Sequence, residues 1–338
     1  MHNLKSFMKP QIGITTGDPA GVGPEISVRA ALNPELMGTC GMVLFGDTAI
    51  LRVQAESLGL PFDFEQISRE ELLGSGSLPA RAVVDVPARQ SEISPGRGSA
   101  AGGEAAAHNI EECVGACMKG RLDAMVTAPL NKKHLREAGY DFPGHTEFLA
   151  NLAKVHDVAM AFLTDRLKLV LVTIHVPLRT AIEQITPSAV LGKIEITLRE
   201  FRRLGLRCDR VAVAGMNPHA GEGGLLGRDE AERIEPAIVE ARRRHPESRI
   251  DGPLPADTIF YRAVQGEFDV VLALFHDQGL GPIKLLGFGE AVNVTLGLPF
   301  VRTSVDHGTA YDIAGKGIAR PESMFAAVRW AVRLARRR

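Results

Sequence analysis

Residues 271–282 read VLALFHDQGLGP, and this stretch indicates the class of fold that the chain adopts. Five apolar residues lead directly to His276 and Asp277, after which the chain breaks into glycines. A short apolar run with such boundaries is typical of a buried strand in a parallel sheet. Similar runs occur at 11–17, 41–47, 81–87, 122–129, 168–175 and 210–217, and stretches with helical spacing lie between them at 24–33, 102–120, 187–205 and 228–245. This alternation predicts an α/β fold with a largely parallel sheet.

Three of the apolar runs each place one imidazole just beyond their carboxyl end: His175, His219 and His276. A single histidine after a strand is usually a hydrogen-bonded loop residue. Three in equivalent positions suit a catalytic divalent ion, most naturally Zn²⁺, with an open fourth position. Ligands of open α/β sheets bind beyond the carboxyl ends of the strands, so the fold would assemble this site. Asp277 is a candidate for orienting one of the rings.

A second candidate site lies in FPGHTEFLA (142–150), where His145 and Thr146 follow a turn and precede an apolar helix start. Thr146 is a candidate for the helix N-cap and, equally, for contact with a ligand. The two roles are compatible, because the exposed N-terminus of a helix attracts phosphate.

The segment GLGPIKLLGFGEAVNVTLGLPFVRTS (279–304) has a high density of glycine around Lys284, Asn293 and Arg302. Glycines allow a ligand to approach the backbone closely, and the two cations suit a phosphate or a carboxylate. The alternative is that Lys284 and Arg302 are solvated surface charges. The glycine setting favours the ligand-binding interpretation.

Bulk composition excludes several classes of protein. The length of 338 residues is enough for two lobes with sizeable cores, and 45% of the residues are hydrophobic, which is ordinary for a globular protein. The balance of Lys+Arg 39 against Asp+Glu 40 gives no support to a broad nucleic-acid-binding surface. No apolar run approaches the roughly 18 residues of a membrane span, and no signal-type segment opens the chain. The four cysteines indicate a reduced, cytoplasmic protein. Neither a Rossmann glycine fingerprint nor a P-loop is present, which disfavours a Rossmann dinucleotide site.

Seven motifs extend over most of the chain, from about Lys9 to Pro321: GITTGDPAGVGPEI, VTAPLNKKHL, PGHTEFLA, NPHAGEGGLLGRDE, DGPLPADTIF, LFHDQGLGPIK and SVDHGTAYDIAGKGIARPES. Together they resemble the 4-hydroxythreonine-4-phosphate dehydrogenase family of pyridoxal phosphate biosynthesis. HGTAYDIAGKGIARP in the last motif also resembles HGSAPDIAGKGIANP, the adenosine-binding loop of isocitrate and isopropylmalate dehydrogenases. Those enzymes bind NAD(P) without the Rossmann fingerprint. Arg320 stands where that wider group has an asparagine near the adenine.

The resemblance implies three groups of site residues: metal ligands at His175, His219 and His276, substrate contacts at His145, Thr146, Lys284, Asn293 and Arg302, and a cofactor loop with Asp306, His307, Gly308, Thr309 and Asp312. The implied cofactor is NAD or NADP, and the implied divalent ion is Zn²⁺, with Mg²⁺ or Co²⁺ as alternatives. The implied substrate is a phosphorylated small molecule.

The resemblance also implies an architecture of the isocitrate/isopropylmalate dehydrogenase type, in which two α/β/α lobes surround a central cleft. Residues 1–135 together with 300–338 would form the first lobe, and residues 136–299 the second. The active site would lie in the cleft and at the interface of a homodimer, with metal ligands drawn from both chains.

Members of the family oxidise the C3 hydroxyl of 4-phosphohydroxy-L-threonine with NAD(P), and the resulting β-keto acid loses CO₂ to give 3-amino-2-oxopropyl phosphate. A divalent ion would acidify that hydroxyl and stabilise the negative charge left by decarboxylation. A general base must accept the hydroxyl proton, and Asp257, Asp277 and Lys284 are candidates.

Three alternative functions stay open at this point. A D-threonate or D-erythronate 4-phosphate dehydrogenase of the same group has the same chemistry, and its substrate lacks the amino group. A phosphate acyltransferase can share the fold, but it needs neither three histidine ligands nor the HGTAYDIAGKG loop. A non-catalytic module that binds sugar phosphates would leave the histidines without a use. Fold alone does not decide among them.

Overall fold

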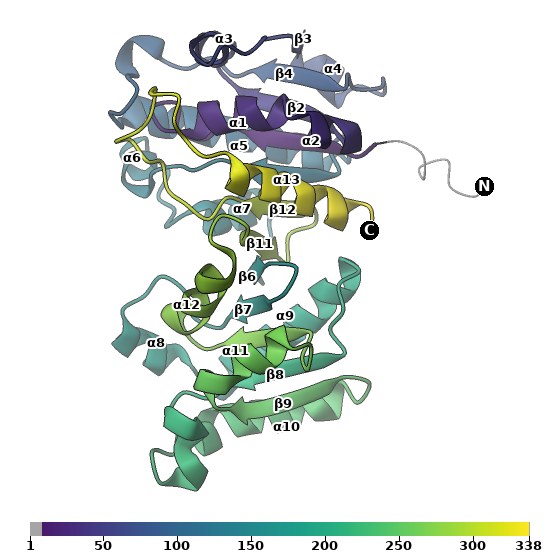
Figure 1. Cartoon of the computed structure of the whole chain (residues 1–338), viewed down its shortest axis with the longest axis vertical. Helices are drawn as coiled ribbons and strands as arrows, with labels where there is room; N and C mark the ends of the chain where they lie inside the picture. The colour runs from purple at the N-terminus through teal and green to yellow at the C-terminus, as the bar shows by residue number, and fades with distance from the viewer. Residues whose placement is uncertain (1–8, 338) are drawn as a thin grey trace, which may run out of the picture. The chain divides into compact units, whose positions relative to one another are not determined.

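The computed structural model describes residues 9–337, which fold into two compact units (Figure 1). Of the described residues, 9–156 and 298–337 form unit 1, and 157–297 form unit 2. The chain therefore leaves unit 1, completes unit 2 and returns. Helix α7 (His145–Ala153) belongs to unit 1, whereas our sequence-based boundary after residue 135 would assign it to the second lobe.

The strands of unit 1 form a parallel array whose interior positions are apolar. Ile14 on the first strand lies between Leu44 and Val126 of its two neighbours, and all three side chains are buried. Strands that are apolar on both faces must be covered on both faces by helices. In spatial order the strands are β3 (Glu65–Ile67), β4 (Arg81–Asp85), β2 (Gly41–Gly46), β1 (Gln11–Thr15), β5 (Ala124–Thr127) and β12 (Val301–Ser304).

Helices cover both faces of this array. Figure 1 shows α1, α2 and α13 together on the face nearer the viewer, with α5 behind the strands. Side-chain caps fix several helix starts: Asp47 accepts a hydrogen bond from Ile50, and Ser68 and Glu71 form a capping box. The helices of unit 1 are α1 (Gly23–Ala31), α2 (Pro34–Thr39), α3 (Thr48–Ser57), α4 (Arg69–Leu73), α5 (Ala100–Met118), α6 (Lys132–Glu137), α7 (His145–Ala153) and α13 (Glu322–Ala335), with a short 3-10 turn at Gln90–Glu92.

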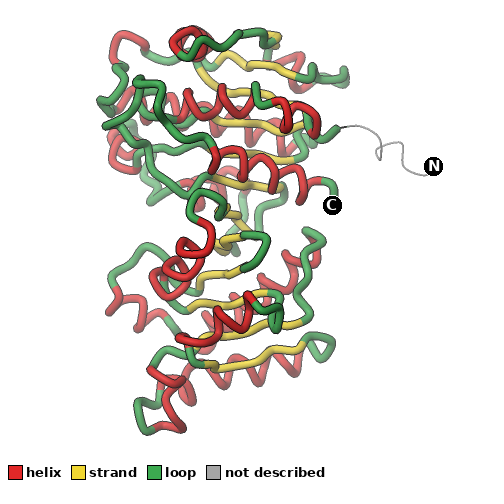
Figure 2. Tube along the Cα trace, viewed as in Figure 1, coloured by secondary structure: helices red, strands yellow, loops and turns green. Residues whose placement is uncertain are grey.

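Unit 2 contains a mixed sheet. In spatial order its strands are β11 (Val292–Leu296), β6 (Ala159–Leu163), β7 (Lys168–Leu171), β10 (Val270–Ala273), β8 (Arg210–Ala214) and β9 (Arg249–Leu254). β6 is antiparallel to both of its neighbours, and the pairs from β7 to β9 are parallel. The helices are α8 (Leu178–Gln184), α9 (Pro187–Arg203), α10 (Glu235–Arg244), α11 (Ala256–Val264) and α12 (His276–Gly287), with a 3-10 segment at Pro218–Gly224 and a π-helical turn at Glu230–Ile234. Helices α9 and α10 cover one face and α11 and α12 the other (Figure 2).

The predicted α/β class is confirmed, and each of the seven predicted apolar runs contains a strand. The glycine-rich segment 279–304 contains most of α12 and all of β11 and β12. Its first glycine serves packing: a Cβ atom on Gly279 would lie 2.8 Å from the Leu171 side chain, so only glycine lets α12 approach β7 this closely. No helix within residues 9–337 is long and apolar enough to cross a membrane.

Candidate active site

Arg302 is a buried cation of unit 1. It lies on β12 with 2% of its surface exposed, and its Nη2 donates a hydrogen bond of 2.7 Å to the Thr127 hydroxyl on the neighbouring strand β5. Burial lowers the pKa of Arg302 to about 9, and the negative charge of Glu147 opposes this shift. The guanidinium therefore stays protonated at neutral pH. A buried cation costs free energy, which a bound phosphate or carboxylate would offset. The surface-charge alternative is thus wrong for Arg302.

His145 is the first residue of α7, and the positive charge of Arg302 affects its pKa. Burial lowers the pKa of His145 well below its usual range, the positive charges of Arg302 and Lys132 lower it further, and a hydrogen bond to the Ala128 carbonyl opposes both. The imidazole is therefore neutral at physiological pH. Its Nε2 is buried without a hydrogen-bond partner in the described part of the chain. Because the other ring nitrogen carries the proton toward Ala128, Nε2 is an acceptor that suits a ligand hydroxyl.

Thr146 is not the N-cap of α7. Gly144 occupies that position, and no side chain caps the helix. Thr146 is instead the second helical residue and is buried beside His145. The capping interpretation is therefore wrong. The helix begins earlier than the sequence pattern indicates, so that the N-cap is Gly144, two residues before Thr146. The ligand-binding interpretation of Thr146 stays a prediction.

Unit 2 brings two of the three strand-end histidines together. The rings of His175, after β7, and His276, at the start of α12, have centroids 5.5 Å apart. Both line a cavity of about 290 Å³ with Phe275 and Leu178. The His276 Nδ1 lies 2.7 Å from the Asp277 Oδ1, so a hydrogen bond to the carboxylate leaves Nε2 of His276 available to a ligand. This is the orienting contact that the sequence predicts for Asp277.

His219 is placed differently from the other two. It lies in the 3-10 segment after β8, in a run of six residues with positive φ (219–224), and is exposed. Within residues 9–337 no group of three or more histidine, cysteine, aspartate or glutamate side chains has the geometry of a metal site. One chain therefore presents two of the predicted imidazole ligands as a pair, and within residues 9–337 the three histidines do not form one metal site.

The remaining predicted residues of unit 2 occupy three separate elements. Asp257 is exposed in the first turn of α11, and Lys284 is half-buried in the last turn of α12. Asn293 lies on β11, and its Oδ1 is buried without a hydrogen-bond partner in the described part of the chain. Such an acceptor is usually satisfied by a ligand or an ordered water.

The predicted cofactor loop follows β12 directly in unit 1. Two contacts hold its backbone: the Thr309 carbonyl accepts a hydrogen bond of 2.9 Å from Val22, and the Asp306 amide donates to the Ser323 hydroxyl. His307, Gly308 and Asp312 are exposed between and beyond these contacts. The backbone of the loop is thus held at Asp306 and Thr309, and the residues around these two positions are accessible to solvent.

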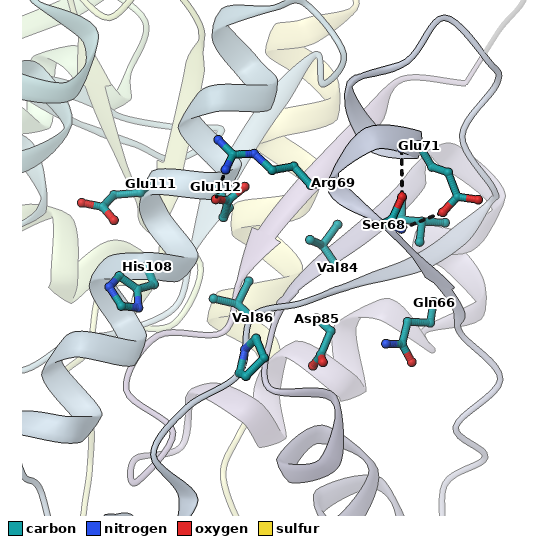
Figure 3. Close-up of a pocket in the computed structure, with 12 residues that line it drawn as sticks. Gln66, Ser68, Arg69, Glu71, Val84, Asp85, Val86, His108, Glu111 and Glu112 are labelled. Carbon is teal, nitrogen blue, oxygen red and sulfur yellow. Dashed lines mark hydrogen bonds and ion pairs between the residues drawn. The ribbon is translucent and has the colours of Figure 1, made fainter.

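A further hollow of about 680 Å³ lies in unit 1 beside β3 and β4 (Figure 3). Its wall includes the ion pair between Arg69 and Glu112, in which Nη1 and Oε1 are 3.3 Å apart, and His108 and Glu111 of α5. None of the predicted site residues lines it.

The family described as pyridoxal phosphate biosynthetic protein PdxA matches residues 38–331. The chain belongs to the PdxA family. This confirms the family that the seven motifs predict.

Two relatives of equal similarity carry different names. The chain is 43% identical over 332 residues to D-threonate 4-phosphate dehydrogenase of Cupriavidus necator, covering 97% of this chain and 98% of that protein. It is also 43% identical over 333 residues to 4-hydroxythreonine-4-phosphate dehydrogenase of Geobacter metallireducens, covering 97% and 96%. The crystal structure of 4-hydroxythreonine-4-phosphate dehydrogenase from Klebsiella pneumoniae matches with a TM-score of 0.86 at 38% identity, over 97% of this chain and 100% of that chain. Both names belong to dehydrogenases, in agreement with the predicted class of enzyme.

The depressed pKa of His145 predicts how stability depends on pH in this PdxA-family chain. Below about pH 6.5 the unfolded chain protonates this imidazole and the folded chain does not, so the free energy of unfolding should fall with pH until the folded pKa is reached. The slope from this residue is at most about 1.4 kcal/mol per pH unit. Urea unfolding between pH 7.5 and 5 should show a smaller loss for His145→Gln than for the wild type. The same change at the exposed His156 is the control, and equal losses in all three proteins would contradict a buried neutral His145.

Proposed function

We propose that this chain catalyses the metal-dependent, NAD(P)-linked oxidation and decarboxylation of 4-phosphohydroxy-L-threonine to 3-amino-2-oxopropyl phosphate. The observation that carries the proposal is the buried Arg302 beside a neutral His145. A protonated guanidinium binds an anionic group of the substrate, and a neutral imidazole with a free acceptor nitrogen binds a hydroxyl. A phosphorylated hydroxy acid offers both groups in one molecule.

Each remaining residue has a proposed role that follows from its chemistry. Thr146 would donate its hydroxyl to the phosphate or carboxylate, and Asn293 would use its unpartnered Oδ1 to accept a hydrogen bond from the substrate. Lys284 would either hold an anionic group or accept the proton of the reacting hydroxyl. Asp257 and Asp277 are the other candidates for that base.

The histidine pair fits a divalent ion. His175 and His276 face one cavity, and Asp277 fixes the ring of His276 through Nδ1. We propose that these two imidazoles and His219 hold Zn²⁺, Mg²⁺ or Co²⁺, with His219 contributed by a second copy of the chain. When bound, such an ion acidifies a hydroxyl and stabilises negative charge on oxygen. The loop with Asp306, His307, Gly308, Thr309 and Asp312 would hold NAD or NADP, which accepts the hydride.

A homodimer in the cytoplasm is part of the proposal. Leu285 and Phe288, at the end of the helix that carries His276, are 89% and 86% exposed. Large apolar side chains on the surface beside a site often mark an interface. A second copy that covers Leu285 and Phe288 would also lie against α12, the helix that begins with His276, and would supply the third ligand there.

D-threonate 4-phosphate is the second candidate substrate, because a relative of that name is as similar to this chain as one named for 4-hydroxythreonine 4-phosphate. Purified protein should be assayed for NADH and NADPH formation with both substrates side by side, in the presence of Zn²⁺, Co²⁺ or Mg²⁺. A higher kcat/KM with the amino substrate supports the first proposal, and the opposite ratio supports the second. No reduced cofactor with either substrate would contradict both.

A further inference from the structure

A partly buried polar contact ties the predicted cofactor loop to Asp18, which lies just after the first strand of unit 1. The Tyr311 hydroxyl donates a hydrogen bond of 2.6 Å to the Asp18 Oδ2. Asp18 follows β1 and is 0% exposed, and its other oxygen accepts a hydrogen bond of 2.9 Å from the Ala20 amide. Hydrogen bonds to an ionised carboxylate are about twice as strong as neutral ones, so this contact is a firm attachment of the loop.

His134 on α6 completes the contact. Its Nδ1 lies 2.9 Å from the Tyr311 hydroxyl oxygen. The single hydroxyl proton of Tyr311 points to Asp18, because an ionised carboxylate is an acceptor only. The Tyr311 oxygen must therefore accept from His134, which fixes the proton of that imidazole on Nδ1. Burial, followed by the hydrogen bond to Asp18, raises the pKa of Tyr311, so the hydroxyl remains a donor over the working pH range.

Two glycines close the space around these three side chains. A Cβ atom on Gly102, in the first turn of α5, would lie 2.5 Å from the Asp18 Oδ1, and one on Gly98 would overlap the His134 ring and approach the Tyr311 hydroxyl at 2.6 Å. The backbone therefore packs directly against the polar groups. A side chain at either position would push the loop or the carboxylate away.

The loop needs such an attachment because its backbone conformation is unfavourable. Ala310, the residue before Tyr311, has φ of 45°, a region that residues with a side chain rarely adopt. Conformations of this kind persist only where the surroundings hold them. The neighbouring positions His307, Gly308 and Asp312 are exposed, so the attachment fixes the conformation of the segment that faces a ligand.

We infer that Tyr311, Asp18 and His134 form a clamp that holds residues 306–312 in the conformation that binds the dinucleotide. Tyr311 is thus a positioning residue, which acts on the cofactor through the loop. The inference rests on the proposed function in one respect, namely that a dinucleotide is the ligand of this loop. The clamp itself is a property of the chain without ligand and can be tested without it.

Tyr311→Phe removes the hydroxyl and keeps the ring. In the protein without ligand, amides in residues 306–316 should exchange hydrogen at least about tenfold faster than in the wild type, because a charge-assisted hydrogen bond is lost. Titration calorimetry with NAD⁺ and NADP⁺ should show a dissociation constant about ten- to a hundredfold higher for the dinucleotide that the wild type binds. Asp18→Asn, which retains an acceptor, should give a smaller change in both measurements. Tyr261→Phe, at an exposed tyrosine of unit 2, should change neither.

The two measurements separate failure of the clamp from failure of the proposed function. Unchanged exchange in 306–316 with a correctly folded Tyr311→Phe protein would overturn the clamp. Faster exchange with unchanged dinucleotide affinity would overturn its role in cofactor binding. A wild-type protein that binds neither dinucleotide would overturn the cofactor assignment, and the exchange result would still decide the clamp. Should Tyr311→Phe fail to fold, hydrogen exchange is measured on Asp18→Asn instead. Faster exchange in residues 306–316 would then support the clamp, and unchanged exchange would overturn it.

Discussion

Dialysis against a chelator should lower kcat by on the order of a thousandfold or more, and added Zn²⁺, Co²⁺ or Mg²⁺ should restore it. The reason is the pair of imidazoles at His175 and His276, whose rings face one cavity with centroids 5.5 Å apart. An ion that acidifies a hydroxyl contributes several kcal/mol to catalysis, and each 1.4 kcal/mol is a factor of ten. Metal content and turnover should be measured on the same samples. Full activity in a preparation verified to be free of metal would contradict the proposed metal dependence.

Variants of the ligands sharpen this test. His175→Ala and His276→Ala should each lose bound metal and activity together, whereas His245→Ala, on the same unit after α10, should lose neither. Asp277→Asn should weaken metal binding by about ten- to a hundredfold, because the carboxylate orients the His276 ring. Loss of activity with full metal content in Asp277→Asn would instead assign Asp277 as the general base.

The proposed second copy can be tested with the same variants. If the partner supplies His219, mixing His219→Ala with His276→Ala should regain part of the activity, because a mixed dimer holds one intact site. Mixing His175→Ala with His276→Ala should stay inactive, since the structure places these two rings together in one chain. Sedimentation that shows a fully active monomer would refute the dimer.

The motifs and apolar runs of the sequence predicted the family and the class of fold. Continuous apolar runs such as GMVLFG (41–46) must be buried on both faces, and this requirement leaves few alternatives to a helix-covered sheet. The antiparallel strand β6 escaped prediction although AMAFL (159–163) is equally apolar. It pairs antiparallel with β7, which follows after residues 164–167, and with β11, which is far away in sequence. The connection TDRL (164–167) contains no glycine or asparagine, the residues that usually indicate a hairpin turn.

The sequence predicts candidate site residues one by one, but it does not predict the contacts that the structure shows among them. The strand-end position of His219 resembles that of the other two histidines in sequence, yet His219 lies in the left-handed turn of PHAGEGG (218–224), and residues 9–337 contain no group of three metal ligands. The partner of Arg302, Thr127, lies 175 residues away in sequence and meets it only because β12 pairs with β5. Tyr311 and Asp18 form their contact across an even longer separation. Contacts of this kind follow from strand order, which local spacing does not determine.

Arg302→Ala should lower kcat/KM by about ten- to a hundredfold or more. Arg302 is 2% exposed and remains protonated, and burying this charge costs free energy. A bound anionic ligand would offset that cost. A hydrogen bond to a charged group contributes roughly 1.5–3 kcal/mol, and each 1.4 kcal/mol is about a factor of ten. Arg302→Lys should recover part of the loss, because lysine keeps the charge and lacks the planar fork. Arg329→Ala, at a half-exposed arginine of the same unit, is the matched control and should leave kcat/KM unchanged.

Three readouts on Arg302→Ala separate loss of the substrate contact from damage to the fold. Circular dichroism should show a folded protein, metal content should equal that of the wild type, and the KM for the dinucleotide should change little. A joint rise in substrate KM and dinucleotide KM would mean that the change has disturbed the 306–312 loop, which begins four residues after Arg302 in the sequence. Unchanged substrate kinetics in a folded protein would show that the buried guanidinium does not bind the substrate, and the anionic group of the substrate would have to be bound elsewhere.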